Sequence, residues 1–263
     1  MLKLTNISKK IRKKILYLSY KAKTAHLASS LSCVDIVVTI YEKFLKCNKN
    51  TKNSKNIFIL SKGHAATTLY SVLNYKKIIS NTVFESYSKK NSILEEHPSH
   101  NIPGISVATG SLGHGLSIGC GIALGFKLKN LKNKVYVLLS DGECNEGSVW
   151  EAVLFASSNK LNNLVLIVDY NKWQATGKTK DILDLGNLKK KFQSFGFNSF
   201  NINGHNFDQI LKKLKNKSTD KPLAIVAHTI KGKGISFMEN NNNWHYKSPN
   251  ENEYLNSIKE IDN

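Results

Sequence analysis

The side chains best suited to chemistry are those of Asp141 and Asn171, because each comes shortly after an apolar run. The two runs, Val135–Leu139 and Leu164–Val168, have the length and composition of buried strands. In a right-handed βαβ unit, both following turns lie at the carboxyl edge of the sheet, where open α/β sheets bind their ligands. One charged and one neutral oxygen side chain at that edge suit a hard cation such as Mg2+.

A helical pattern follows the Asp141 turn and adds a means of binding an anion. Gly142 allows the backbone to approach a ligand closely. A helix that starts after Gly147 offers unpaired N–H groups and a positive dipole end. A divalent cation at Asp141 and Asn171, beside a helix start that attracts an anion, indicates a diphosphate site. Asp-Gly after a strand and Asn at a strand end are also ordinary turn chemistry, so these features alone leave a purely structural interpretation open.

These turns need a parallel sheet to position them, and the rest of the chain supplies its elements. Two more apolar runs, Ile57–Leu60 and Leu223–Ala227, have the character of buried strands. Helical spacing occurs over Leu116–Leu128, from Gly147 to Leu161, and over the N-terminal residues 7–22. This alternation predicts an α/β fold with a central, mostly parallel sheet and helices on both faces. We expect one domain over residues 1–263, with a C-terminal tail from about residue 239.

Composition narrows the class of protein. The 263 residues carry a formal net charge of +19, which raises the question of a nucleic-acid partner. Only one of the 38 basic residues is an arginine, Arg12, and the lysines are scattered, so we expect no nucleic-acid role. No run of about 18 apolar residues occurs, which predicts no membrane span. The four cysteines form no C-x-x-C pair and fit a reducing compartment, so we expect a cytoplasmic location.

The stretch 135–177 resembles the thiamine-diphosphate motif, which opens with G-D-G and closes about 30 residues later with Asn. It is most similar to the motif of the transketolase family, although Ser140 stands where that motif has its first glycine. The residues that carry this similarity are Asp141, Gly142, Glu146 and Asn171.

Other segments resemble the same family in the same order along the chain. They are TAHLASSLSCVDIV around His26, FILSKGHAATTLYSVL around His64, the His-Pro and Gly-rich region from Glu95 to Gly125, and HTIKGKGISFMENNNNWHYKSPN with His245. The resemblance covers about residues 10–255, and five ordered segments are far more specific than one short motif.

The resemblance implies a thiamine-diphosphate-binding fold with thiamine diphosphate and Mg2+ as cofactors. Asp141 and Asn171 would hold the metal through side-chain oxygens, with the backbone carbonyl of Trp173 as a third ligand. Asn171 would also count among the cofactor-binding residues, and Gly142 would contact the diphosphate. Glu146 would organise the interface near the cofactor.

The histidines of the matching segments would handle cofactor and substrate. His64 and His245 would lie beside the diphosphate and the thiazolium ring. His26, His97 and His245 would meet the sugar hydroxyls and move protons, a role that suits a group with a pKa near neutrality. The residues that would line the aminopyrimidine side are Leu112, Gly113 and His114. For His100, His205 and His228 a surface or core role is the better interpretation.

The length of the chain indicates what is missing. In transketolases, a pyrimidine-binding domain with a cofactor-activating glutamate and a C-terminal domain follow this domain. The chain therefore resembles the N-terminal subunit of a split transketolase, which would act with a separate C-terminal subunit in an α2β2 assembly. It would transfer a two-carbon ketol unit from a ketose phosphate to an aldose phosphate. A deoxyxylulose-phosphate synthase-like subunit is the main alternative, although His97 and the WHYKSP segment favour transketolase.

Overall fold

The computed structural model describes residues 1–45, 47, 55–215 and 220–262. Its strands are β1 (Ile57–Leu60), β2 (Val135–Ser140), β3 (Leu164–Tyr170), β4 (Asn198–Asn203) and β5 (Leu223–His228). Its α-helices are α1 (Leu2–Ala22), α2 (Leu27–Ser32), α3 (Val34–Ile40), α4 (Ala66–Tyr75), α5 (Asn81–Glu85), α6 (His114–Leu128), α7 (Gly147–Ser158), α8 (Thr179–Ile182), α9 (Leu188–Ser194), α10 (Phe207–Leu214) and α11 (Glu251–Asp262). A π-helical turn spans Tyr41–Leu45, and 3₁₀ helices span Gly63–Ala65, Gly142–Asn145 and Asn242–His245.

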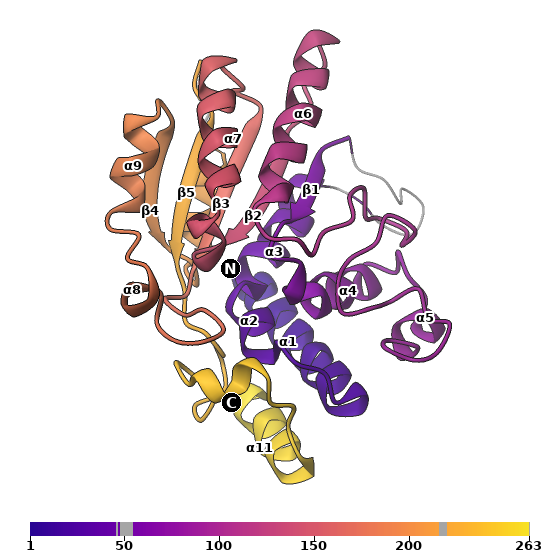
Figure 1. Ribbon diagram of the computed structural model, residues 1–263. Coiled ribbons are helices and arrows are strands. Elements are labelled where there is room, and N and C mark those ends of the chain that lie inside the picture. The colour runs from indigo at the N-terminus through magenta and orange to yellow at the C-terminus, as the bar shows by residue number, and fades with distance from the viewer. Residues whose placement is uncertain (46, 48–54, 216–219, 263) are drawn as a thin grey trace.

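The strands of the described residues form one sheet in the order β1-β2-β3-β5-β4. Every neighbouring pair is parallel; for example, Val135 of β2 is level with Ile57 of β1 and with Leu164 of β3. All the carboxyl ends therefore meet at one edge, which faces α2 in Figure 1. The predicted α/β fold with a mostly parallel sheet is confirmed.

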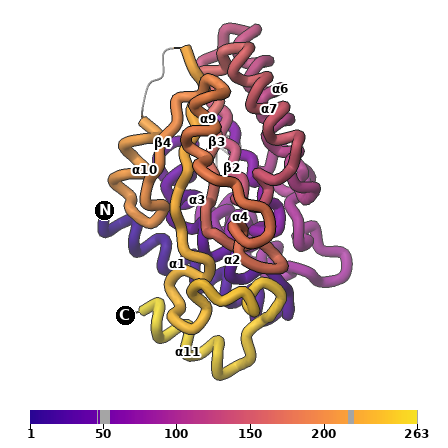
Figure 2. The backbone as a smooth tube through the Cα atoms, turned by 60° about the vertical axis from the view of Figure 1, so that its left-hand side comes forward, coloured from indigo at the N-terminus to yellow at the C-terminus, as the bar shows by residue number. Residues whose placement is uncertain are grey.

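Each face of the sheet is covered by its own apolar core, because successive strand residues point to opposite faces. Val137 and Leu139 of β2 pack with helices α6, α7 and α9, whereas Tyr136 and Leu138 pack with the helices of the other face. Figure 2 shows α6 and α7 together on one side of the sheet and α10, which contacts α3, on the opposite side. No helix of the described residues is long and apolar enough to cross a membrane.

The predicted strand runs coincide with β1, β2, β3 and β5, but the edge strand β4 was not foreseen. Only Phe200 and Ile202 of its sequence NSFNIN are apolar, so β4 lacks the continuous apolar run of the other four strands. The predicted helix to Leu161 ends earlier, at Ser158. The expected C-terminal tail contains a helix, α11, whose Tyr254 ring stacks on Tyr20 of α1 with centroids 4.6 Å apart.

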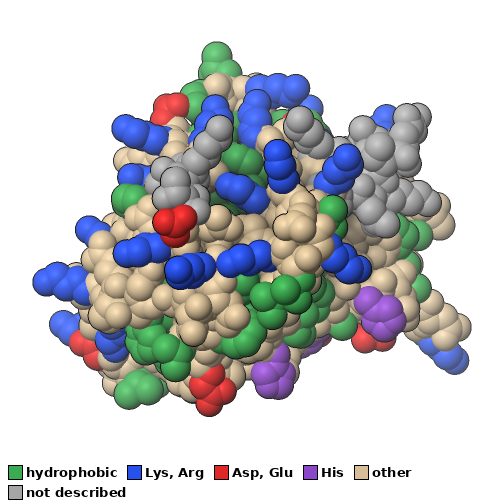
Figure 3. Space-filling model, turned by 90° about the horizontal axis from the view of Figure 1, so that it is seen from above, with side chains coloured by type: hydrophobic (Ala, Val, Ile, Leu, Met, Phe, Trp, Pro, Cys, Tyr) green, Lys and Arg blue, Asp and Glu red, His purple; other side chains and the backbone are tan. Residues whose placement is uncertain are grey.

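The lysines that give the chain its charge are spread over the surface. Seen from the end of the sheet at which the strands begin, lysine side chains are separated by apolar and neutral polar surface (Figure 3). Two lysines are different, because Lys62, which follows β1, and Lys231, which follows β5, are completely buried.

A buried ion pair ties the carboxyl edge of the sheet together. The Lys62 ammonium lies 2.6 Å from Asp169 Oδ2 of β3, and neither side chain has any exposed surface. Lys62 also donates to the Ser29 carbonyl of α2 at 3.0 Å. Asp169 accepts from the hydroxyls of Ser32 and Thr229 as well, so four segments converge on one pair. Burial alone would lower the pKa of Lys62, but the Asp169 charge outweighs it and raises that pKa above its ordinary value.

Removing one partner should therefore be costly. In Asp169→Asn the Lys62 charge stays buried without a counter-charge, and we expect the free energy of unfolding to fall by about 3–5 kcal/mol. Urea denaturation measures the change, with the exposed Asp181→Asn as the matched control, for which less than about 0.5 kcal/mol is expected. If the free energy of unfolding fell by less than about 1 kcal/mol in Asp169→Asn, the ion pair would not be a main source of stability at the carboxyl edge of the sheet.

Candidate functional site

Asp141 lies directly after β2 and is completely buried. Its hydrogen-bond partners are the backbone N–H groups of Gly142 (3.1 Å) and Lys172 (2.8 Å) and the hydroxyl of Thr179 (2.9 Å). These donors are all neutral. Burial accordingly raises the pKa of Asp141 to about 6. A buried carboxylate served only by neutral dipoles is suited to a cation, which would restore its charged form.

The loop after β3 forms a small hairpin beside Asp141. Asn171 is buried and its Oδ1 accepts from the Trp173 N–H at 3.0 Å. The Gln174 N–H donates to the Gly177 carbonyl at 2.8 Å and closes the turn. The predicted metal ligands Asp141, Asn171 and Trp173 are therefore brought together, on the turns of adjacent strands. Among the described residues no group of three or more His, Cys, Asp or Glu side chains is placed to hold a metal ion.

A buried donor without a partner lies at the same place. Gln174 Nε2 is buried and makes no hydrogen bond within the described structure. Its side chain packs over Gly142, where a Cβ would come within 2.9 Å of Gln174 Cγ. The absence of a side chain at Gly142 therefore leaves room for Gln174, whose unpaired amide donor lies beside the Gly142 backbone. Buried donors are normally paired, so this arrangement fits an anionic group at Gly142.

Three of the predicted histidines form a cluster opposite these residues. The His26 ring lies 5.4 Å from that of His64 and 5.1 Å from that of His245, between centroids. His26 adopts a left-handed conformation with φ 66°, and its N–H donates to the His245 carbonyl at 2.7 Å. The cluster thus joins the start of α2, the turn after β1 and the segment before α11.

The histidines of the cluster are neutral at pH 7. Burial, together with the nearby cationic groups, lowers the pKa of His26 to about 4 and that of His245 to about 3. Burial and the Lys62 charge lower the pKa of His64 well below its ordinary value. Neutral imidazoles can accept a hydrogen bond from a ligand hydroxyl, but a pKa this low makes each ring a weaker base than free imidazole.

His97 lies at the rim of the cluster. Its side chain is exposed, and its ring packs against Gly110, where a Cβ would come within 3.2 Å of His97 Cδ2. Glu96 beside it is 4.0 Å from His26 Nδ1. His97 is therefore placed to meet a ligand that enters the cluster from outside.

The predicted aminopyrimidine segment is held against the turn after β2. Gly113 has φ 85°, a conformation that favours glycine, and an added Cβ would lie 2.8 Å from the Glu146 Cβ. Its N–H donates to Glu143 Oε1 at 2.9 Å, and its carbonyl accepts from Ser148. Leu112 and His114 flank Gly113. Leu112 is half-buried, whereas His114 and Glu146 are exposed.

Two buried charged residues beside the site were not singled out by sequence reasoning. Glu143 is completely buried and joins Ser61, Gly113 and Ser140. Lys231 is also buried, and its ammonium contacts His245 Nδ1 at 3.0 Å. The only signal in the sequence was position, because Glu143 follows the Asp-Gly pair and Lys231 lies in the KGKG segment before His245.

Among the described residues, no carboxylate forms a hydrogen bond or ion pair with the Lys231 ammonium. Besides His245, its ammonium contacts the Asn242 Oδ1 at 2.6 Å and the Gln174 carbonyl at 3.3 Å. Burial and the Lys62 charge lower its pKa to about 8. A cation held only by neutral acceptors, beside an unpaired amide donor, suits an anionic ligand.

Other candidates stay outside the site. Cys144 is buried and burial raises its pKa well above the ordinary value, so it is not a reactive thiolate. His205, for which a structural role was expected, binds Asp35 and the Ile230 N–H. His228 packs edge-on against Tyr170, with ring centroids 5.1 Å apart.

Comparison with known proteins identifies relatives of this arrangement. Residues 5–261 match the protein family described as "Transketolase, thiamine diphosphate binding domain". The chain is 36% identical over 258 residues to one subunit of the apulose-4-phosphate transketolase of Phocaeicola vulgatus, covering 97% of this chain and 92% of the relative. It is 34% identical over 234 residues to a 6-deoxy-6-sulfo-D-fructose transketolase subunit of a Clostridium species, covering 87% and 85%.

Solved structures agree with this result. The crystal structure of the transketolase of Campylobacter jejuni superimposes with a TM-score of 0.93 at 27% identity. The match covers 100% of this chain but 43% of that one. The chain therefore spans less than half the length of that enzyme.

The depressed histidine pKa values predict how stability depends on pH. In the unfolded chain a histidine titrates near 6.5, above the folded values of about 4 and about 3. Between these values the unfolded state binds more protons, so stability is retained above pH 6.5 and falls as the pH drops from 6.5 towards 4.

A His26→Asn, His245→Gln variant should lose less stability than the parent between pH 7 and pH 4.5. Asparagine tolerates the left-handed backbone at position 26. After allowance for solvent screening, we expect the difference to be about 1–2 kcal/mol. Urea denaturation at the two pH values measures it. Parallel pH profiles of the two proteins would contradict the assignment of neutral, buried histidines.

Proposed function

Because the chain belongs to the transketolase family as a thiamine-diphosphate-binding domain, we propose that it is the N-terminal subunit of a split transketolase. The enzyme would transfer a two-carbon ketol unit between phosphorylated or similarly anionic sugars. The observation that carries the proposal is the convergence of Asp141, Asn171, an unpaired Gln174 amide and three neutral histidines at one edge of the sheet.

We propose that Asp141, Asn171 and the Trp173 carbonyl hold Mg2+, which would anchor the diphosphate rather than act as a Lewis acid on the substrate. Oxygen donors of this kind match the preference of Mg2+, which is bound through few protein ligands together with phosphate oxygens. The metal would also supply the positive charge that the neutral donors around Asp141 lack.

The diphosphate would lie over Gly142, within reach of the Gln174 amide and the Lys231 ammonium. His64 and His245 would flank it on the side of the thiazolium ring, with Leu112, Gly113 and His114 on the aminopyrimidine side. Thiamine diphosphate, when bound, supplies the nucleophilic carbon that receives and releases the two-carbon unit. The chain's own residues contribute position, charge and proton transfer.

We propose that His26, His97 and His245 meet the hydroxyls of the sugar. His26 and His245 are neutral at pH 7 and would accept a hydroxyl proton as the carbon–carbon bond breaks. The same groups would return that proton to the acceptor product. The exposed His97 would orient the sugar at the entrance and share in this transfer.

The chain is proposed to act with a second, separate polypeptide that carries the pyrimidine-binding domain and its glutamate. Relatives that match it over 92% and 94% of their own length are named as single subunits of transketolases, which supports such a partner. Exposed apolar side chains suited to assembly occur on the two packed helices α6 and α7, where Ile118, Leu154 and Phe155 are 39%, 59% and 42% exposed. We propose an α2β2 complex with the cofactor between the two kinds of domain.

Asp141→Ala tests the metal site. We expect the assembled complex to lose Mg2+-dependent binding of thiamine diphosphate by at least about a hundredfold, because the only carboxylate of the donor set is gone. Isothermal titration with and without Mg2+ measures the affinity. Asp181→Asn, on the surface, is the control. Unchanged affinity in Asp141→Ala would refute the metal assignment.

Reconstitution tests the need for a partner. We expect the purified chain alone to show no ketol transfer, and activity to appear on mixing it with the C-terminal subunit, because the activating glutamate is proposed to lie there. The substrates to compare are xylulose 5-phosphate with ribose 5-phosphate, apulose 4-phosphate, 6-deoxy-6-sulfo-D-fructose, and pyruvate with glyceraldehyde 3-phosphate. Turnover by the chain alone would contradict the split-enzyme proposal, and a reaction restricted to pyruvate would replace ketol transfer with synthase activity.

A further inference from the structure

A network of charged side chains outside the cofactor site centres on the only arginine of the chain. Arg12 of α1 donates to Asp35 of α3 through both ends of its guanidinium, Nη1 to Oδ1 at 3.1 Å and Nη2 to Oδ2 at 2.8 Å. Its Nε donates to the Lys233 carbonyl at 3.0 Å. Both side chains of the ion pair are nearly buried, at 9% and 7% exposure.

The identity of this residue is informative because of the composition of the chain. The other 37 basic residues are all lysines. The planar guanidinium of Arg12 donates to both carboxylate oxygens of Asp35 and, through Nε, to the Lys233 carbonyl. A lysine ammonium is a single point charge and cannot make these three contacts in the same geometry. Gly234 leaves room for it, since φ is 98° there and an added Cβ would lie 3.0 Å from Arg12 Cδ. Geometry therefore demands arginine at this position.

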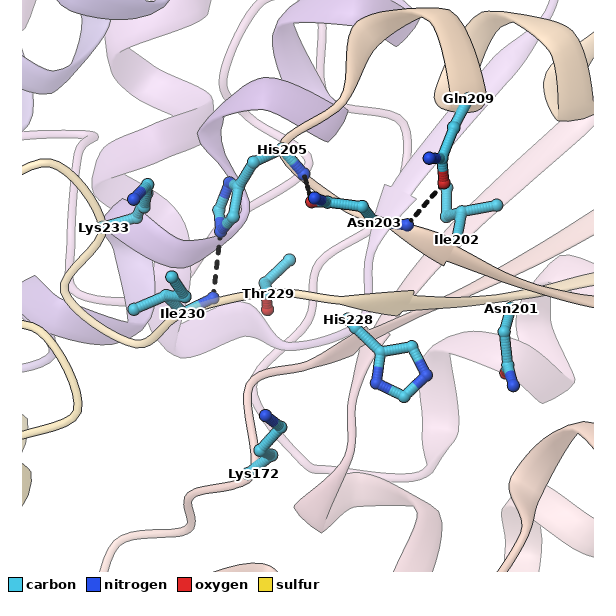
Figure 4. Close-up of a pocket in the computed structure, with 10 residues that line it drawn as sticks. All are labelled: Lys172, Asn201, Ile202, Asn203, His205, Gln209, His228, Thr229, Ile230 and Lys233. Carbon is cyan, nitrogen blue, oxygen red and sulfur yellow. Dashed lines mark hydrogen bonds between the residues drawn. The ribbon is translucent and has the colours of Figure 1, made fainter.

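His205 completes the network from the loop between β4 and α10. Its Nδ1 lies 2.8 Å from Asp35 Oδ2, and its Nε2 accepts from the Ile230 N–H at 2.9 Å, the contact drawn in Figure 4. Because Nε2 is an acceptor, the ring proton must lie on Nδ1 and be donated to Asp35. Burial would raise the pKa of Asp35, but the Arg12 charge and the hydrogen bonds from His205 and Arg12 outweigh it and hold that pKa below its ordinary value.

The network grips one short segment at both ends. His205 holds the N–H of Ile230 and Arg12 holds the carbonyl of Lys233. Between them lies Lys231, whose ammonium reaches His245 at 3.0 Å. The Gly232 N–H donates to the Ala28 carbonyl of α2 at 2.9 Å, which ties the same segment to the helix that begins after His26.

We propose that Arg12, Asp35 and His205 form a brace that positions Lys231 for the diphosphate and so sets the affinity for the cofactor. These are positioning residues, because none of them touches the histidine cluster or the Asp141 turn. The effect of the brace on cofactor affinity rests on the proposed function. The hold on residues 230–233 rests only on the hydrogen bonds of Arg12 and His205.

A double-mutant cycle tests the brace through its effect on Lys231. Arg12→Lys keeps the charge and removes the fork, and we expect it to weaken thiamine diphosphate binding by the assembled complex by about tenfold. In a Lys231→Met background the same change should have less than about a twofold effect, because the group that the brace positions is absent. Isothermal titration at saturating Mg2+ gives the four affinities, and Lys10→Arg on the exposed face of α1 is the control.

A second measurement is independent of the cofactor. Amide hydrogen exchange of the chain alone should become faster at Ile230 and Gly232 in Arg12→Lys and stay unchanged in Lys10→Arg. If Arg12→Lys does not fold, His205→Gln removes a different member of the brace, and its carboxamide cannot hold both Asp35 and Ile230 in the same way. The same acceleration and the same affinity loss are expected.

Unchanged exchange at residues 230–234 would overturn the brace, whatever the affinities are. An equal affinity loss with and without Lys231 would overturn its action through that lysine. A wild-type complex that binds no thiamine diphosphate would overturn the proposed function and the cofactor half of this inference, while the exchange result would decide the brace separately.

Discussion

The buried pair of Lys62 and Asp169 is the constraint on which the site depends. A charged lysine with no exposed surface is tolerated only while its counter-charge and hydrogen-bond acceptors stay in place. Those partners come from β3, from α2 through Ser29 and Ser32, and from the segment after β5 through Thr229, which binds Asp169. Segments distant in sequence must therefore meet at one point for the pair to be satisfied.

The residues of the candidate site lie a few positions from this pair along each segment. His64 comes two residues after Lys62, Asn171 two after Asp169, and Lys231 two after Thr229. Fixing the pair thus fixes the starting points of the histidine cluster and the Asn171 hairpin. Lys231 lies beyond the end of β5, so the sheet does not fix its position. We attribute its positioning to Arg12 and His205, which bind the backbone on either side of it.

The electrostatics of the site follow from the same burial. Lys62 is neutralised by Asp169, whereas Lys231 contacts only neutral acceptors and Asp141 only neutral donors. The histidines of the cluster are held neutral by desolvation and by the lysines. A metal ion at Asp141 and a diphosphate at Lys231 would supply the two missing charges, and this complementarity is the physical basis of the proposed cofactor site.

The sequence was sufficient for the parts of the molecule that local patterns encode. Continuous apolar runs predicted β1, β2, β3 and β5, and the turns after β2 and β3 predicted that Asp141 and Asn171 would meet. The edge strand β4 was missed because polar residues interrupt it. The resemblance to transketolases, rather than any pattern, singled out His26, His64 and His245. Lys62 with Asp169, and Arg12 with Asp35 and His205, join residues far apart in the chain, and nothing local in the sequence marks such pairs among so many lysines.

The most direct test of the account is a crystal structure of the assembled complex grown with thiamine diphosphate and Mn2+ in place of Mg2+. The anomalous signal of manganese locates the metal without reference to any expected position. We predict one manganese peak within bonding distance of Asp141, Asn171 and the Trp173 carbonyl, with the diphosphate between that peak and Lys231. A manganese peak elsewhere, or a cofactor bound away from this edge of the sheet, would contradict it.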